Sequence, residues 1–264
     1  KKLLLLAGPT ASGKSNLAIK LAKKLNGEII NADSMQVFKE FSILSSRPSS
    51  SQTKKVKHHL YGMISVRKYF SSGDWLKQAK KKINICIKNK KLPIVVGGTG
   101  LYFNIITKGL TKIPDIDSKT RNKVRTLYKK LGSKKFYEKL SKLDPKVKGR
   151  ILPTDSQRVQ RAYEVKLKTK KSLFDWFANT KSDFLDFEIK KIFINIPREE
   201  LLKKISIRTE LMFKKRCINE VKKFNNLRVN KSLSANKLIG VKEINDFLSK
   251  SISLQKCKDL INIK

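Results

Sequence analysis

Residues 8–15 constrain the fold more than any other segment, because they read Gly-Pro-Thr-Ala-Ser-Gly-Lys-Ser and match the pattern G-x-x-x-x-G-K-[ST]. The apolar residues 3–7 before them predict a buried strand, and apolar residues recur at helical spacing over residues 17–25. A strand, a glycine loop and a helix in this order are typical of a phosphate-binding loop, whereas a chance glycine turn requires neither flanking element. In such a loop Lys14 supplies a positive charge, and the Ser15 hydroxyl can bind Mg²⁺.

Three further apolar runs predict strands at residues 28–31, 92–96 and 192–196. Helical periodicity lies between them at residues 76–89, and a helix follows Pro197. Strands that alternate with helices predict an α/β fold with a doubly wound parallel sheet.

The pattern changes between residues 114 and 190, where strand signals vanish and Lys-rich amphipathic helices follow one another. We therefore expect a phosphate-loop core formed by residues 1–114 and 190–264, interrupted by a helical insertion over residues 115–189. The chain lacks an initiating Met and its last five residues carry no helix-stop signal, so we expect a fragment of a longer protein.

The composition is strongly basic, with 61 Lys and Arg against 21 Asp and Glu and a formal net charge of +40. This surplus favours nucleic acid as a partner, because each phosphate contact releases condensed counterions. An AT-rich genome, which enriches Lys, Asn and Ile throughout a sequence, would explain the same surplus. The three cysteines are far apart and form no CxxC pair, which favours a reducing cytoplasm over a disulfide framework or a zinc site. No segment has the length and apolar character of a membrane span.

Asp33 is the candidate catalytic carboxylate. Nucleotide hydrolases usually carry an Mg²⁺-binding Asp at the end of an apolar strand, but residues 92–96 end in Gly97-Gly98-Thr99. Asp33 instead follows the strand at residues 28–31, and the carboxyl ends of parallel strands face the ligand crevice. There it can accept a proton from a nucleophile. The alternative is that Asp33 caps a following helix.

Other candidates have weaker local support. Gln157 and Arg161 share one helix face with Arg158 beside them; Gln can bind an adenine edge and Arg a phosphate, although a solvated basic helix fits as well. Arg208 could reach a diphosphate, and a surface salt bridge is an equal alternative. We interpret the His58-His59 pair as packing in a loop, without an acidic or cysteine partner at metal-ligand spacing.

Together, these segments resemble the tRNA dimethylallyltransferases. The similar stretches occur in the family's order over nearly the whole chain: GPTASGKS at residues 8–15, NADSMQVF at 31–38, PIVVGGTGLYF at 93–103, QRVQRAYEV at 157–165 and IGVKEI at 239–244. The resemblance implies transfer of a dimethylallyl group from dimethylallyl diphosphate to the exocyclic amine of the adenosine 3′ of the anticodon. It also implies tRNA as a partner. We expect a monomer and no association with a membrane. The alternatives are a sister enzyme that prenylates free adenine nucleotide and a small-molecule P-loop kinase.

The resemblance assigns roles to individual residues. Asp33, Thr10 and Thr99 are implied to be catalytic, with Asp33 as the base. The implied diphosphate-binding residues are Gly8, Pro9, Thr10, Ala11, Ser12, Gly13, Lys14 and Ser15, to which we add Arg208, and Ser15 is the implied Mg²⁺ ligand. The implied tRNA-binding residues are Asp33, Ser34, Met35, Gln36, Thr99, Arg121, Gln157, Arg158, Val159, Gln160 and Arg161.

The chain departs from the family pattern in a few places. The family usually carries a D-I-G-T-A-K-P-like stretch, and residues 42–48 replace it with Ser-Ile-Leu-Ser-Ser-Arg-Pro. Arg47 keeps the positive charge of that stretch. Arg216-Cys217 stands where a glycine and an aromatic residue are usual, and Val241 replaces a frequent Tyr.

Overall fold

The computed structural model describes residues 1–264, which fold into two compact units. The core unit comprises Lys1–Ile105 and Asp186–Lys264, and the helical unit comprises Ile106–Leu185. The sequence placed these boundaries at residues 115 and 189. No helix combines the length and the apolar character needed to cross a bilayer.

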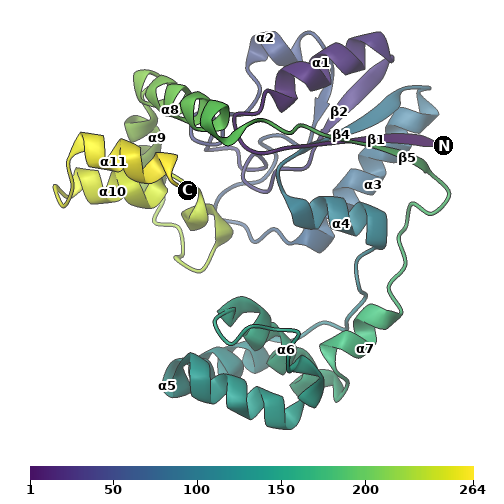
Figure 1. Ribbon diagram of the computed structural model, residues 1–264, viewed down its shortest axis with the longest axis vertical. Coiled ribbons are helices and arrows are strands. Elements are labelled where there is room, and N and C mark those ends of the chain that lie inside the picture. Colours follow the sequence, from purple (N-terminus) through teal and green to yellow (C-terminus); the bar gives the residue numbers. More distant parts are fainter. The chain divides into compact units, whose positions relative to one another are not determined.

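A five-stranded parallel sheet with the strand order β3-β2-β4-β1-β5 forms the centre of the core unit (Figure 1). The strands are β1 (Lys2–Ala7), β2 (Gly27–Asn31), β3 (His58–His59), β4 (Leu92–Gly97) and β5 (Glu188–Phe193). Leu3–Leu6 of β1 are buried between neighbours on both sides, because Leu4 pairs with Ile94 and with Lys190. Continuous apolar runs such as this one are typical of parallel strands that are covered on both faces.

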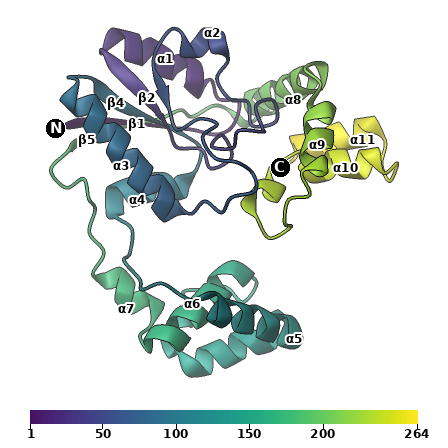
Figure 2. The ribbon, with the colours of Figure 1, turned by 180° about the vertical axis from the view of Figure 1, so that it is seen from behind.

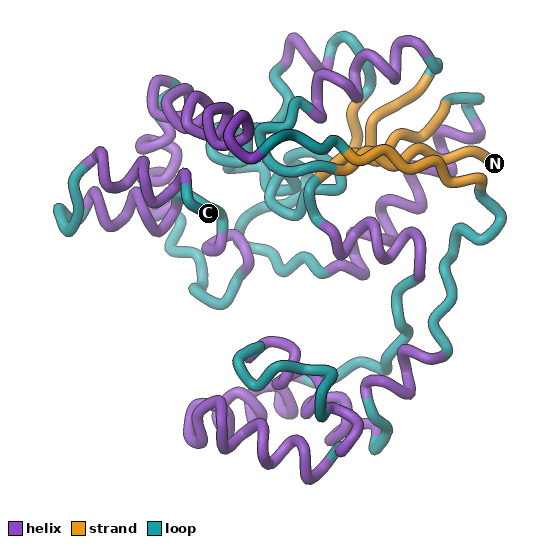
Figure 3. The backbone as a smooth tube through the Cα atoms, in the orientation of Figure 1, coloured by secondary structure: helices purple, strands orange, loops and turns teal.

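Helices cover both faces of the sheet, which confirms the doubly wound α/β fold. Helix α1 (Lys14–Lys24) lies on one face together with the short α2 (Ser50–Thr53), while α3 (Ser72–Lys88) and α4 (Gly100–Lys108) lie on the other (Figures 1 and 2). The strands, orange in Figure 3, are therefore the middle layer of the core unit. Helix α3 begins four residues earlier than the helical periodicity at residues 76–89 indicated: Ser71 is its N-cap, and the Ser71 and Asp74 side chains form a capping box.

The last part of the core unit is a helical layer of its own. It contains α8 (Arg198–Lys214), α9 (Cys217–Asn226), the 3-10 turn Ser234–Lys237, α10 (Val241–Leu248) and α11 (Leu254–Asn262). Its apolar faces pack around Phe41, Leu44 and Phe224. The segment that follows β2 therefore carries the side chains that join this helical layer to the rest of the core unit.

The helical unit contains no strand. Its elements are α5 (Ser118–Leu143), the 3-10 turn Pro145–Val147, α6 (Ser156–Thr169) and α7 (Leu173–Ala178). Gly132 interrupts α5 with a left-handed φ of 71°. Phe136 and Leu140 of α5 and Val159 of α6 are completely buried in its centre.

Two sequence expectations about strands need correction. The run at residues 192–196 predicted a strand, and a strand is present, but β5 spans Glu188–Phe193. Because β5 is an edge strand, Ile189 and Ile192 are its more buried positions while its lysines stay exposed, so the strand lacks the continuous apolar run expected of a central one. His58 and His59 form the opposite edge strand, β3, instead of a loop.

Candidate active site

The phosphate-type loop connects β1 to α1. It turns through two left-handed residues, Ala11 with a φ of 58° and Gly13 with a φ of 82°. Glycine adopts such a φ without the strain that a side chain introduces, and Gly13 is the N-cap of α1. The Lys14 ammonium folds back over the loop, where it donates to the Pro9 carbonyl and lies 3.5 Å from the Ser12 hydroxyl.

Three charged side chains influence one another at this loop. Burial lowers the pKa of Lys14 from 10.5 to about 8, the charge of Asp33 opposes that change, and the charge of Arg208 adds to it. Burial likewise lowers the pKa of Arg208, and Asp33 partly restores it. The structure thus gathers residues from β2's carboxyl end, from the start of α1 and from α8 around one place. An anion bound there would favour the protonated forms of Lys14 and Arg208 and so oppose the effect of burial on their pKa values.

Asp33 lies at the carboxyl end of β2 in a braced turn. Its Oδ1 accepts hydrogen bonds from the backbone N–H groups of Met35 at 2.8 Å and Gln36 at 3.3 Å. The Asn31 side chain fixes the turn from behind, because it accepts from Asp33 N at 2.8 Å and donates to Asp33 O at 3.0 Å. No helix follows Asp33, so the turn replaces the helix cap that was the alternative interpretation.

Thr99 supports the same turn from β4. Its Oγ1 accepts from the Ser34 N–H at 3.0 Å, and its own N–H donates to the Ala32 carbonyl at 3.2 Å. Gly97 allows this close approach, since a Cβ there would lie 2.1 Å from the Ala32 carbonyl oxygen. Thr99 therefore positions the Asp33 segment. Thr10 is exposed at the start of the loop.

A loop over residues 42–46 faces the Asp33 turn and α8. The Gln36 amide donates to the carbonyls of Ser45 at 2.8 Å and Ser46 at 3.2 Å. The Arg208 Nε–H donates to the Ser46 hydroxyl at 2.9 Å. These contacts connect the divergent stretch at residues 42–48 to two of the candidate site residues.

A cavity of about 440 Å³ adjoins the glycine loop. Its walls include Gly8 and Pro9 of the loop, Gly98 after β4, and the apolar side chains of Phe103, Ile196 and Leu201. Only one charged residue, Arg198, lies among its walls. A mostly apolar cavity beside a phosphate-type loop can accommodate a molecule with a charged end and a small apolar end.

The structure also locates the candidate residues of the helical unit, all on or beside α5 and α6. Gln157 and Arg158 are exposed, Arg161 is half-buried, and Arg121 is half-buried on α5. Arg158 pairs with Asp155 at 3.4 Å and Arg161 with Glu164 at 3.5 Å, and the Gln160 amide donates to the Ser156 carbonyl. Val159 is fully buried in the core of this unit, so its side chain cannot present itself to a ligand.

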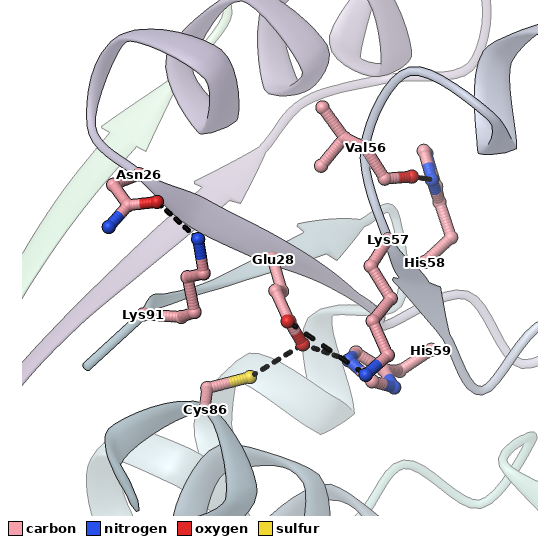
Figure 4. A network of polar contacts seen from close by, with 8 residues as sticks. All are labelled: Asn26, Glu28, Val56, Lys57, His58, His59, Cys86 and Lys91. Carbon is pink, nitrogen blue, oxygen red and sulfur yellow. Dashed lines mark hydrogen bonds and ion pairs between the residues drawn. The ribbon is translucent and has the colours of Figure 1, made fainter. Parts of the chain in front are cut away.

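Sequence reasoning missed a buried polar network at the far end of β2 (Figure 4). The His59 Nε2–H donates to Glu28 Oε2 at 2.6 Å, the Cys86 thiol donates to the same oxygen at 3.6 Å, and Lys57 lies 3.9 Å from Oε1. Burial alone would raise the pKa of Glu28, but the His59 hydrogen bond and the nearby positive charges lower it overall. A Glu28 carboxylate oxygen, a His59 ring nitrogen and the Cys86 sulfur, which are all atom types that can bind a metal ion, lie within 4.8 Å of one another. Because they already satisfy one another, we interpret the network as a structural link between β2, β3 and α3.

A doubly wound sheet with this glycine loop, and with a carboxylate on the neighbouring strand, defines a P-loop protein of the group-transfer type. The family model described as IPP transferase matches residues 36–264. The tRNA dimethylallyltransferase of Pelagibacter ubique is 52% identical over 263 residues, covering 100% of this chain and 84% of that relative. That of Rickettsia massiliae is 40% identical over 265 residues, covering 100% and 73%. The chain belongs to the IPP transferase family.

Solved structures agree with this assignment. The tRNA isopentenylpyrophosphate transferase of Bacillus halodurans is 30% identical with a TM-score of 0.67, and the match covers 99% of this chain and 82% of that one. A eukaryotic dimethylallyltransferase acting on tRNA is 26% identical with a TM-score of 0.85, and the match covers 100% and 66%.

Proposed function

We propose that this chain is a tRNA dimethylallyltransferase, which transfers the dimethylallyl group of dimethylallyl diphosphate to N6 of the adenosine 3′ of the anticodon. The relatives that carry this name align with the whole chain. The observation that carries the proposal is the charged cluster of Lys14, Asp33 and Arg208 around the glycine loop. It combines two cations for a diphosphate with one carboxylate that can take a proton.

In the proposed reaction, the exocyclic nitrogen attacks the primary carbon of the donor. The new N–C bond forms as the C–O bond to diphosphate breaks, and Asp33 accepts the proton that the nitrogen loses. Lys14 and Arg208 stabilise the negative charge that develops on the leaving diphosphate, in a site where burial strengthens the interaction. The apolar cavity beside the loop suits the five-carbon group.

We further propose that Mg²⁺ takes part in binding the donor. A hard cation prefers oxygen ligands, and the hydroxyl of half-buried Ser15 at the start of α1 fits this preference. When bound, Mg²⁺ would neutralise charge on the diphosphate.

The helical unit is the proposed binding site for tRNA, through Gln157, Arg158, Arg161 and Arg121. Phosphate contacts would position the tRNA, and a base contact by Gln157 would contribute selectivity. The target adenosine must leave its stack to reach a catalytic carboxylate. We also propose that the protein is a monomer. We place it in the cytoplasm, and its three free, buried cysteines are consistent with that reducing compartment.

Transfer of label from dimethylallyl diphosphate tests the proposal. The protein is incubated with labelled donor and Mg²⁺, and with unmodified tRNA or AMP in parallel reactions. We expect labelled tRNA and unlabelled AMP, with label lost when the adenosine 3′ of the anticodon is replaced by guanosine. Labelled AMP without labelled tRNA would instead support the enzyme of free nucleotides. Phosphorylation of a small molecule from ATP would support a kinase.

A further inference from the structure

Glu220 of α9 lies among the backbone N–H groups of the loop at residues 42–46. Its Oε1 accepts from Ser42 N at 2.7 Å, from Ile43 N at 2.9 Å and from the Ser42 hydroxyl at 3.2 Å, and its Oε2 accepts from Leu44 N at 2.9 Å. We propose that Glu220 is a positioning residue for the transfer reaction, because it fixes this loop and, through it, Arg208 and the Asp33 turn.

The Glu220 carboxylate is buried, and both of its oxygens accept hydrogen bonds from the protein. Glu220 is only 9% exposed, and three consecutive N–H groups converge on its two oxygens. A charged acceptor makes shorter and stronger hydrogen bonds than a neutral one, and consecutive N–H groups form a natural anion site. The guanidinium of Arg47 adds a favourable charge at longer range. Glu220 thus determines the path of the loop in the way that a bound anion would.

The far end of the loop reaches the candidate active site. Ser46 has a φ of 52°, a left-handed conformation that is unfavourable for serine and persists only when the surroundings impose it. Here they do so from both sides, because Glu220 holds residues 42–44 and the Gln36 amide holds the Ser45 and Ser46 carbonyls. The strain is therefore located where the loop meets the site.

Two contacts connect the loop at residues 42–46 to Arg208 and to Asp33. The Ser46 hydroxyl accepts from Nε of Arg208, which fixes the plane of the guanidinium and leaves its other N–H groups for a ligand. Gln36, whose side chain holds the loop, donates its backbone N–H to Asp33 Oδ1. A loosened loop should therefore misplace both the cation that faces the diphosphate and the carboxylate that faces the amine. This inference rests on the proposed function, since it assigns Glu220 to that same reaction.

The test measures single-turnover transfer with saturating donor and tRNA for Glu220→Gln. The amide keeps one acceptor oxygen, so at least one loop N–H loses its partner while the side chain keeps its size. We expect the rate to fall by about ten- to one-hundred-fold, the scale that a misplacement of about 1 Å produces, with tRNA affinity unchanged. Ser46→Ala removes the Arg208 contact at 2.9 Å together with a long hydrogen bond to the Ile43 carbonyl at 3.5 Å, and it should cost a few-fold. If Glu220 acts through Ser46, the double variant should be no slower than Glu220→Gln alone.

Glu28→Gln is the matched control. Glu28 is also a buried carboxylate of the core unit, 7% exposed, and its partners His59, Lys57 and Cys86 belong to a different network (Figure 4). It should lower the melting temperature and leave the saturated single-turnover rate unchanged. Equal rates for wild type and Glu220→Gln would overturn the proposal, as would equal rate losses for the two glutamine variants. Multiplicative losses in the double variant would overturn the route through Ser46.

Affinity for inorganic diphosphate with Mg²⁺ separates this inference from the proposed function. Glu220→Gln should weaken diphosphate several-fold, and Glu28→Gln should not, whichever acceptor the enzyme uses. If wild type fails to modify tRNA but this difference persists, the acceptor assignment fails and the positioning role stands. If Glu220→Gln does not fold, Glu220→Asp and Ser46→Ala replace it in the same comparison. Unchanged diphosphate affinity in both would then refute the role.

Discussion

The lowered pKa of Lys14 predicts how diphosphate binding depends on pH. Burial places this pKa at about 8, well below 10.5. Because the folded-state value lies below the unfolded value, the charged amine destabilises the fold below pH 8, and the cost vanishes above pH 10.5. That cost is about 3 kcal/mol. A bound diphosphate supplies the missing counter-charge, so binding should favour the protonated amine and raise its pKa.

The size of the effect follows from the titration. With a pKa of about 8, roughly nine-tenths of Lys14 carries a proton at pH 7 and roughly one-tenth at pH 9. If diphosphate requires the protonated amine, its apparent Kd should rise about tenfold across this range, or about 1.4 kcal/mol. At pH 8, binding should take up about half a proton from the buffer.

Calorimetric titration of inorganic diphosphate at fixed free Mg²⁺ measures both quantities, when repeated in two buffers with different heats of ionisation. Lys14→Arg is the control, because arginine stays charged throughout this range. The ligand's own protonation and its Mg²⁺ chemistry affect both proteins equally. The difference between their pH profiles therefore isolates Lys14. Equal changes in Kd from pH 7 to 9 for wild type and Lys14→Arg would refute the reasoning.

Three further predictions concern other parts of the molecule. Asp33→Ala should lower single-turnover transfer by roughly two to four decades and leave tRNA affinity nearly intact, and normal turnover would remove Asp33 from the mechanism. Arg161→Ala and Arg121→Ala should weaken the binding of tRNA but not of the donor. If Arg161 contacts a phosphate, Arg161→Ala should reduce the salt dependence of tRNA binding by about one unit of slope. If Gln157 contacts a base, Gln157→Ala should cost roughly 1–3 kcal/mol of discrimination against the wrong base. Glu28→Gln should lower the free energy of unfolding at pH 7 by about 1–3 kcal/mol in denaturant titrations. Because the folded-state pKa of Glu28 is lowered, this difference from wild type should shrink as the pH falls below 4.5, and a constant difference would contradict it.

The parts of the site that local sequence could predict are those that follow directly from a strand end. The run before Gly8 and the helix after Ser15 identified the glycine loop, and the rule for parallel strands placed Asp33 beside it. The glycine loop and the placement of Asp33 both depend on contacts within a few residues or between neighbouring strands. The charge of Asp33 raises the pKa of Lys14, which is consistent with this placement.

The contacts that sequence reasoning could not provide join segments far apart in the chain. Glu220 binds the loop that begins at Ser42, and Arg208 reaches Ser46, yet nothing in the spacing of α8 or α9 indicates a partner near β2. The Glu28 and His59 pair was missed for a related reason. A two-residue edge strand has no periodicity, so the sequence could not show that β3 would place His59 against β2.

The anchoring by Glu220 also explains how this chain tolerates its departure from the family pattern at residues 42–48. Ser42 and Leu44 replace the usual Asp and Gly on either side of Ile43, but Glu220 binds the backbone N–H groups of all three residues, which every residue except proline provides. The same path can therefore be kept with different side chains. The Ser46 hydroxyl is different, because the usual stretch has alanine at that position and cannot offer Arg208 an acceptor. The backbone anchor should consequently matter more to the reaction than Ser46 itself, and so Glu220→Gln is expected to cost more than Ser46→Ala.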